Sequence, residues 1–389
     1  MEPPFARRMA VLGTETAFDV LARALALEAQ GRSVLHLEMG EPDFPTPGFV
    51  VEAGVEALRG GWTRYGPAAG QADLRAAVAA RVASTRGVPV DPDEVVVAPG
   101  AKPILFHAIL ALVEEGDEIL LPLVGFPIYE SMARFAGGTC VFYDLPEERG
   151  FSPDPARIAS LLTPRTKLLV LNSPGNPCGG VSTAQDLERI AEAVRATRAW
   201  VLSDEIYADF VYEGGHASIL SCAGMKERTV LADGFSKSWS MTGWRAGWGV
   251  MPVEMARAVT RLQINATSST ASFTQRAGLA ALRGPREPVE RMVAEFRVRR
   301  DAFVAGLNRV RGFRCLPPRG AFYAFPSVRG TGFDSKEVAS RILEEAGVAC
   351  VAGTAFGAGG EGFVRFSFAA SRESLQEAVE RLQGLFGKG

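Results

Sequence analysis

The chain has 389 residues, a length that favours two domains over a single hydrophobic core. Hydrophobic residues make up 47% and charged residues 22%, as in ordinary globular proteins, and the formal net charge of -2 argues against nucleic acid or an anionic membrane as a partner. The sequence has no run of about 18 apolar residues, so we expect no transmembrane helix.

The 5 cysteines and 3 histidines are scattered along the chain, without a CxxC pair or a histidine cluster. This distribution fits incidental thiols in a reducing compartment better than a disulfide framework or a metal site. Residues 1–8 lack the apolar core of a signal peptide. We therefore expect a cytoplasmic protein that binds no metal ion.

The predicted elements begin with an amphipathic helix over residues 18–30. Short, mostly apolar runs then alternate with helical patterns such as the one over residues 183–197. The runs cover residues 95–98, 118–121, 168–171, 200–203, 229–232 and 246–250. Such runs are typical of strands buried on both faces of a sheet, so the alternation predicts an α/β fold with a mostly parallel central sheet flanked by helices.

The C-terminal part has a different pattern. Its predicted elements are a second amphipathic helix at 289–310, strand-like pieces at 320–325 and 362–368, and a final helix at 373–386. We expect a large domain at residues 48–285 and a smaller α+β domain built from both ends of the chain, residues 1–47 and 286–389.

Polar side chains follow several predicted strands at the point where each strand ends. The segments are PGAK at 99–102, NSPGNP at 172–177, DEIY at 204–207 and DGFSK at 233–237. Ligands of open α/β sheets bind outside the carboxyl ends of the strands. The sequence therefore predicts a site where these segments meet.

Taken one at a time, these residues have ordinary structural explanations. The turn at Gly100 would open a helix whose N-terminus suits a phosphate, but such turns are common. Asp204 could be a helix cap, Lys237 a solvated lysine and Arg245 a surface arginine rather than an anion clamp. As a set they match one cofactor, because pyridoxal 5′-phosphate needs a lysine for its aldehyde, an acid for its pyridine nitrogen and a cradle for its phosphate.

Several segments carry a resemblance to a known family. They are SKSWSMTGWR at 236–245, GEPDF at 40–44, YGPAAG at 65–70, NSPGNP at 172–177, DEIY at 204–207 and VRFS at 364–367. In content and order they resemble the class I aminotransferases of pyridoxal-phosphate fold type I, the aspartate aminotransferase-like family. The resemblance extends from about residue 30 to about residue 370.

The resemblance implies a role for each matching position. Lys237 would form the internal aldimine and move the proton between the substrate Cα and the cofactor. The other implied cofactor contacts are Asp204 to the pyridine nitrogen, Asn176 and Tyr207 to the ring oxygen, and Phe126 against the ring face. The phosphate would be held by the backbone donors of Ala101 and Lys102, by Ser236 and Arg245, and by Tyr65 of the partner subunit. Arg365 would bind the substrate α-carboxylate, with Gly40 and Asn176 beside it. The implied unit is a homodimer with an intersubunit active site.

Some of these positions also have simpler explanations. Phe126 could be a core residue, and Arg365 could be an exposed residue of an alternating strand. The role of Tyr65 depends wholly on the resemblance.

The reaction implied is transamination in amino-acid metabolism. The amino group of an L-amino acid would pass to a 2-oxo acid, with 2-oxoglutarate as the expected acceptor, by a ping-pong mechanism. Cys178 stands where the family often has threonine. Lys102 occupies a position where some members carry a lysine that reads a distal carboxylate. If Glu15 pairs with Lys102, distal acids lose that attraction, so the substrate stays open.

The sequence also bears on three alternative functions. Residues 357–362 match GxGxxG, but a strand-like piece rather than a helix follows them, which argues against a nicotinamide dehydrogenase. A carbon–sulfur β-lyase, or other Cα chemistry with the same cofactor, would share the fold; Arg365 holding the carboxylate in the ring plane would favour cleavage of Cα–H and hence transamination. A binding module without catalysis is disfavoured by the intact Lys237, Asp204 and Arg245.

Overall fold

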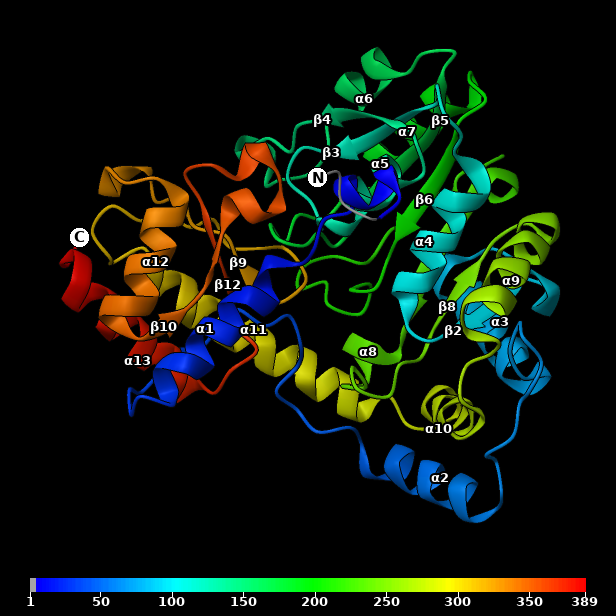
Figure 1. The fold of residues 1–389 in the computed structure, drawn as a ribbon, viewed down its shortest axis with the longest axis horizontal. Coiled ribbons are helices and arrows are strands. Elements are labelled where there is room, and N and C mark those ends of the chain that lie inside the picture. The colour runs from blue at the N-terminus through cyan, green and yellow to red at the C-terminus, as the bar shows by residue number, and fades with distance from the viewer. Residues whose placement is uncertain (1–4) are drawn as a thin grey trace.

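A sheet of seven strands forms the centre of the computed structural model, which describes residues 5–389 (Figure 1). Its strands are β2 (Val95–Ala98), β3 (Glu118–Pro122), β4 (Thr139–Tyr143), β5 (Thr166–Asn172), β6 (Trp200–Asp204), β7 (Thr229–Gly234) and β8 (Gly247–Val250). The order across the sheet is β2-β8-β7-β6-β5-β3-β4. All pairs from β7 to β4 are parallel, whereas β8 pairs antiparallel with both neighbours. The predicted mostly parallel α/β sheet is confirmed.

Strand β4 has no counterpart among the strands predicted from the sequence. This strand lies at the edge of the sheet beside β3, and its residues 139–142 are exposed or only partly buried. An edge strand of this kind lacks the long apolar run that marked the other strands, because one side of it is not covered by a neighbouring strand.

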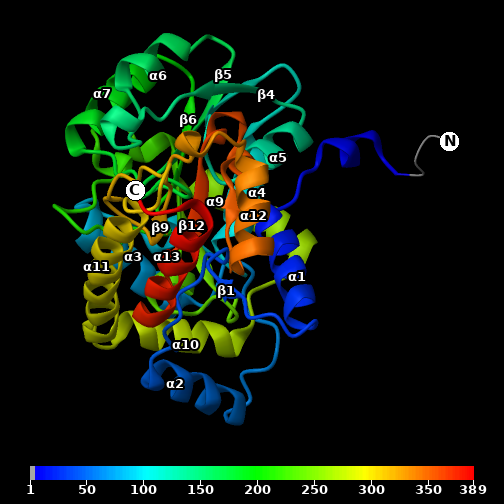
Figure 2. The same cartoon turned by 90° about the vertical axis from the view of Figure 1, so that its left-hand side faces the viewer.

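Helices cover both faces of the sheet, as Figures 1 and 2 show from two directions. They are α2 (Gly48–Arg59), α3 (Ala72–Arg86), α4 (Ala101–Leu112), α5 (Ile128–Phe135), α6 (Pro155–Leu161), α7 (Ala184–Arg195), α9 (Val253–Thr267) and α10 (Ser272–Arg283). Alternate residues of β5 enter different cores: Leu168 and Val170 pack with α4, α5 and α9, whereas Leu169 and Leu171 pack with α6 and α7. Burial on both faces explains the continuous apolar runs.

Elements from both ends of the chain pack together beside the sheet. They are α1 (Thr16–Glu28), α11 (Glu287–Leu307), α12 (Ser335–Ala346), α13 (Arg372–Phe386), β1 (Leu35–His36), β9 (Tyr323–Ala324), β10 (Val348–Ala349), β11 (Val351–Ala352) and β12 (Val364–Ser367). Strand β1 pairs parallel with β10, so the N-terminal segment joins the C-terminal one. The strand-like pieces expected at 320–325 and 362–368 contain the shorter β9 and β12.

The exact division into a domain at 48–285 and one at 1–47 plus 286–389 stays a prediction. Residues 1–4 of the second predicted domain lie outside the described residues. Within residues 5–389, no helix combines the length and apolar character needed to cross a membrane.

Candidate active site

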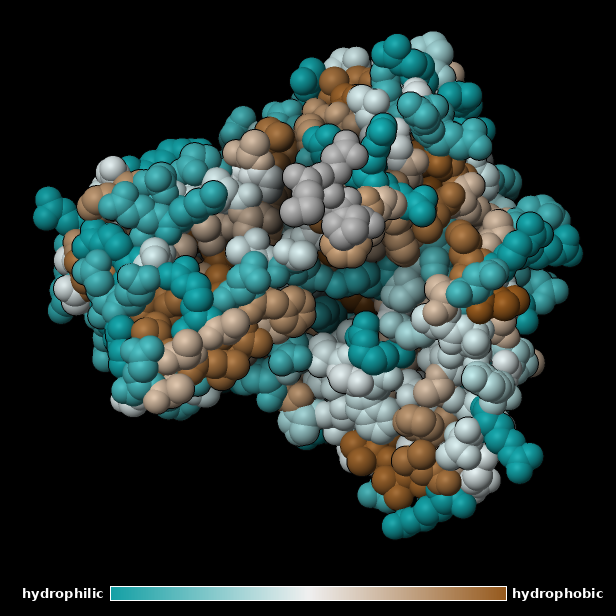
Figure 3. All heavy atoms as spheres, in the orientation of Figure 1, coloured by the Kyte–Doolittle hydropathy of each residue, from teal (hydrophilic) through white to brown (hydrophobic). Residues whose placement is uncertain are grey.

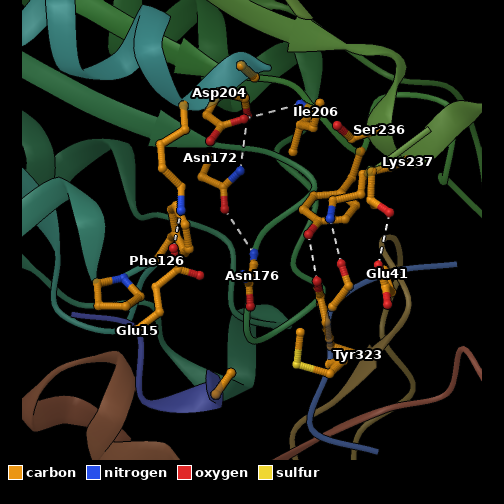
Figure 4. A pocket seen from close by; sticks show the side chains of 18 of the residues that line it. Glu15, Glu41, Phe126, Asn172, Asn176, Asp204, Ile206, Ser236, Lys237 and Tyr323 are labelled. Atoms are coloured by element: carbon orange, nitrogen blue, oxygen red, sulfur yellow. Dashed lines mark hydrogen bonds and ion pairs between the residues drawn. The ribbon is translucent and has the colours of Figure 1, made fainter. Parts of the chain in front are cut away.

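A cavity of about 540 Å³ lies at the carboxyl ends of β5, β6 and β7 (Figure 4). The predicted site residues that line it are Gly40, Ala101, Lys102, Phe126, Asn176, Asp204, Tyr207, Ser236, Lys237, Arg245 and Arg365. Tyr65 is different, because it is 90% exposed and lies outside this cavity. The segments that follow the predicted strands therefore meet at one place, as the strand-end argument requires.

Lys237 lies in α8 (Phe235–Ser238), a single turn that follows β7 directly. Its Nζ donates a hydrogen bond to the backbone oxygen of Gly40, which belongs to the N-terminal part of the chain. Burial lowers the pKa of Lys237 to about 8, against the opposing effect of Glu41 and Glu15. A lysine with a lowered pKa is neutral for part of the time near pH 7 and can act as a nucleophile.

Asp204 is the last residue of β6 and is 5% exposed. Its carboxylate accepts hydrogen bonds from the Tyr129 hydroxyl at 2.6 Å and from the backbone N–H of Ile206 at 3.2 Å. Burial raises the pKa of Asp204 to about 6, although both hydrogen bonds favour the charged form. A buried acid with only neutral donors around it suits a cationic partner in the cavity.

The loop after β5 is tied to the end of β6 by side-chain amides, as the dashed lines in Figure 4 show. Asn172 Nδ2 donates to the backbone oxygen of Asp204 at 3.0 Å, and Asn172 Oδ1 accepts from the backbone N–H of Asn176 at 2.9 Å. These bonds hold Asn176 at the cavity wall, where its Oδ1 accepts from Arg365 Nη1 at 3.1 Å.

Arg365 lies on β12 and is 3% exposed, so the alternative of a solvent-exposed arginine is wrong. Besides Asn176, its guanidinium donates to the backbone oxygen of Glu38. It lies 4.7 Å from the ring centre of Tyr323 and 4.8 Å from that of Phe356. Within the described residues its buried Nε has no hydrogen-bond partner. A buried guanidinium with a spare donor at a cavity wall is suited to an incoming carboxylate.

Two tyrosines connect the sheet with the smaller set of strands. The hydroxyls of Tyr207 and Tyr323 lie 2.6 Å apart, and burial raises the pKa of both phenols. A Cβ at Gly40 would come within 2.4 Å of the Tyr323 hydroxyl, so this position requires glycine for the backbone to approach. Tyr323 is therefore a shared support of the cavity, contacting elements from three parts of the chain.

The N-terminus of α4 and the side chain of Arg245 form a cradle suited to an anion. Gly100 precedes the helix with a φ of +96°, and a Cβ there would come within 2.5 Å of Arg245 Nη2. A Cβ at Gly247 of β8 would come within 2.4 Å of the backbone nitrogen of Ala101. Backbone N–H groups at a helix start, beside a guanidinium, match a phosphate. The residues present therefore fit the predicted cofactor at its aldehyde, ring nitrogen and phosphate.

Phe126 forms part of the cavity wall just before α5, and its ring meets that of Tyr129 edge to face at 5.7 Å. Lys102 Nζ lies 5.4 Å from the centre of the Phe126 ring. The same Nζ donates to Glu15, so the ion pair considered in the sequence analysis is present.

The buried carboxylate next to Asp204 belongs to a separate cluster. Glu205 receives hydrogen bonds or ion pairs from Arg86 at 2.8 Å, His216 at 2.8 Å and Ser218, and it is 1% exposed. Although burial opposes the charge, Arg86 and His216 lower the pKa of Glu205 to about 2. The two adjacent carboxylates at the end of β6 thus have different surroundings: Glu205 lies among cationic partners, and only Asp204 of the two lines the cavity.

Four residues of the cavity wall were not predicted from the sequence, namely Tyr129, Asn172, Tyr323 and Phe356. Asn172 directly follows the strand predicted at 168–171 and could have been chosen by the same rule as Asp204. Cys178 packs in the core with Phe151 and Phe325 rather than lining the cavity.

The chain is similar to proteins of known kind along nearly all of its length. The family described as aminotransferase class I and II matches residues 32–382. An aspartate aminotransferase of Geobacillus stearothermophilus is 37% identical over 97% of both chains, and a probable aspartate/prephenate aminotransferase of Aquifex aeolicus is 39% identical over 98% of both.

Solved structures give the same result. The aspartate aminotransferase from Thermus thermophilus with maleate has a TM-score of 0.95 and 38% identity, covering 98% of this chain and all of that one (100%). The aromatic aminotransferase from Pyrococcus horikoshii has a TM-score of 0.88 and 38% identity, covering 94% of this chain and 98% of that one. These similar proteins are named for different amino-acid substrates.

Proposed function

Since this chain belongs to the class I and II aminotransferase family and is an aminotransferase, we propose that it holds pyridoxal 5′-phosphate in the cavity and works by a ping-pong mechanism. An L-amino acid gives up its amino group and leaves as a 2-oxo acid, and a second 2-oxo acid then takes the group. We propose 2-oxoglutarate as that acceptor.

The observation that carries this proposal is that partly buried Lys237 and buried Asp204 line one cavity with opposite pKa shifts. Burial lowers the pKa of Lys237 to about 8 and raises that of Asp204 to about 6. The lysine can therefore lose its proton near neutral pH, whereas the acid keeps its charge when a cation sits beside it.

The cofactor, when bound, supplies an electron sink for the electron pair released at the substrate Cα. Lys237 would hold its aldehyde carbon and carry the proton removed from Cα. Asp204 would keep the pyridine nitrogen protonated. The remaining proposed contacts are Asn176 and Tyr207 to the ring oxygen and Phe126 to the ring face. The backbone N–H groups of Ala101 and Lys102, together with Ser236 and Arg245, would hold the phosphate.

Arg365 would bind the substrate α-carboxylate. Its unpaired Nε and its contact with Asn176 support this role, and Gly40 brings backbone atoms to the same place. With the substrate α-carboxylate held by Arg365, the Cα–H bond is the one positioned for cleavage. Transamination requires the cleavage of that bond. The β-lyase alternative is not favoured, since the relatives compared are named aminotransferases.

We also propose that the functional unit is a homodimer in the cytoplasm. Figure 3 shows hydrophobic side chains gathered at the surface over α2. Leu58 of this helix, and Trp62 and Tyr65 after it, are all exposed. Tyr65 would reach the phosphate in the partner subunit, which explains its position outside its own cavity. The free cysteines suit a reducing compartment.

The experiment is an absorbance titration of the purified protein with a panel of amino acids and no acceptor. We expect a visible band from lysine-bound cofactor, bleaching with suitable donors and recovery when a 2-oxo acid is added. Lys237→Ala should lose the band and turnover, whereas Lys336→Ala, at an exposed position, should keep both. Full turnover in Lys237→Ala would refute the mechanism, and a persistent band with release of ammonia would indicate a lyase.

A further inference from the structure

A salt bridge at the cavity wall joins residues far apart in the sequence. Glu15 directly precedes α1, and Lys102 lies in the first turn of α4. The Lys102 side chain is 43% exposed and that of Glu15 is 20% exposed, so the pair lies where the cavity meets solvent. Both residues line the cavity, and Figure 4 shows Glu15 beside Phe126.

The other charged groups of the lining have partners or proposed roles. Lys237, Asp204 and Arg245 belong to the cofactor, and Arg365 belongs to the substrate α-carboxylate. Glu41 accepts a hydrogen bond from the Thr242 hydroxyl at 2.9 Å. The side chains of Lys102 and Glu15 are left, and they neutralise each other. A charged substrate side chain would therefore have to interact with this pair.

We propose that Glu15 occupies the place on Lys102 that a distal substrate carboxylate would take, so that the enzyme prefers amino donors with uncharged side chains over aspartate and glutamate. This inference rests on the proposed function. Apolar members of the cavity lining agree with it, since they offer contact to an uncharged side chain. They are Ala17, Phe18, Leu105, Val351 and Phe356.

The Glu15–Lys102 pair disfavours substrates with a second carboxylate in two ways. Glu15 is tethered to the protein and loses little freedom on binding Lys102, whereas a free carboxylate must give up its own. The negative charge of Glu15 also reaches the reacting end of the cavity, because it is among the charges that oppose the burial-induced fall in the pKa of Lys237. A second carboxylate therefore meets both a closed ion pair and a like charge. Dicarboxylates, including 2-oxoglutarate, bind only after displacing Glu15, which weakens their apparent affinity.

Glu15→Gln tests this directly, because it removes the charge and keeps the shape. We expect the dissociation constant of succinate, a dicarboxylate without an amino group, to fall about tenfold in calorimetry on the loaded enzyme. The kcat/KM values of aspartate and glutamate should rise by a similar factor, while those of leucine and phenylalanine stay within about twofold. Adding Lys102→Met should remove the gain for dicarboxylates.

The matched control is Asp19→Asn, which removes an exposed negative charge from the first turn of α1. It should leave succinate binding and the ratio of donors unchanged. An unchanged affinity for succinate in Glu15→Gln, or an equal gain for leucine and aspartate, would overturn the inference. Bleaching of the absorbance band by any amino acid still supports transamination in that case, whereas no bleaching by any donor refutes the proposed function itself.

Discussion

Among residues 5–389, the Asp204 carboxylate accepts one side-chain hydrogen bond, donated by the Tyr129 hydroxyl at 2.6 Å. Removing this donor by Tyr129→Phe should raise the pKa of Asp204 further above its value of about 6, because burial then acts with less opposition. A hydrogen bond to a charged group contributes about 1.5–3 kcal/mol, which corresponds to about one to two pKa units. Since only the ionised acid can pair with a protonated ring nitrogen, the acidic limb of the kcat/KM profile should move to higher pH.

Tyr143→Phe is the matched control for this prediction. Tyr143 is also buried, but its hydroxyl donates to the backbone oxygen of Val170 at 2.7 Å rather than to Asp204. Its loss should lower stability without moving the acidic limb. Equal pH profiles for Tyr129→Phe and the unchanged enzyme would show that Tyr129 does not control the charge of Asp204.

The sequence reveals Asp204 and Lys237 because each closely follows an apolar strand, and strand ends share one edge of a parallel sheet. Neither Tyr129 nor Tyr323 stands at the end of an apolar strand in this way. Tyr129 lies inside α5 with the spacing of an ordinary core residue, and Tyr323 comes from a two-residue strand near the other end of the chain. Only the tertiary structure brings them to the cavity, so local pattern cannot identify them.

At the scale of elements, the anion cradle depends on how closely β8 approaches the start of α4. Gly247→Ala should displace the helix N-terminus, because the new Cβ would lie 2.4 Å from the backbone nitrogen of Ala101 and 2.6 Å from the carbonyl carbon of Gly100. We expect the affinity of the apoenzyme for pyridoxal phosphate to fall at least about tenfold, since a phosphate contact to a helix start depends on its position. Titration of the apoenzyme with cofactor, followed by absorbance, measures this.

Gly249→Ala, two residues along the same strand, is the control. Its Cβ would meet the side-chain ends of Met251 and Ile104 rather than backbone. These ends can shift, so cofactor affinity should change less than with Gly247→Ala, although some stability is lost to overpacking. Equal losses of cofactor affinity in both variants would mean that strand distortion, rather than the helix start, sets the affinity.

The elements themselves were largely predictable because long apolar runs and helical spacing reflect burial on both faces of a sheet. The order of strands was not. Strand β8 follows β7 in sequence and pairs antiparallel with it, whereas β2, at residues 95–98, pairs with β8, at residues 247–250, far along the chain. An apolar run does not show which strand lies beside it in the sheet, or whether the two strands pair parallel or antiparallel. The edge strand β4 is only partly buried, and its apolar pattern is too weak to predict a strand.

At the scale of the whole molecule, the proposed dimer requires that each cavity uses Tyr65 of the partner subunit. Tyr65 is 90% exposed, so its replacement should leave the subunit folded. A heterodimer of one Tyr65→Ala subunit and one Lys237→Ala subunit contains one site with both native residues. We expect the purified heterodimer to show about half of the wild-type activity, although each variant homodimer is nearly inactive.

The decisive comparison places both substitutions in the same subunit and pairs it with a wild-type subunit. One site of this heterodimer then lacks Lys237 and the other lacks Tyr65, so neither is complete and activity should be lost. The two heterodimers have identical composition and differ only in the arrangement of the changes, so protein stability and the number of intact residues are matched. Equal activity of the two arrangements would show that Tyr65 does not act across the interface, and a protein that sediments as a monomer under assay conditions would refute the dimer itself, because an intersubunit site cannot form without a partner.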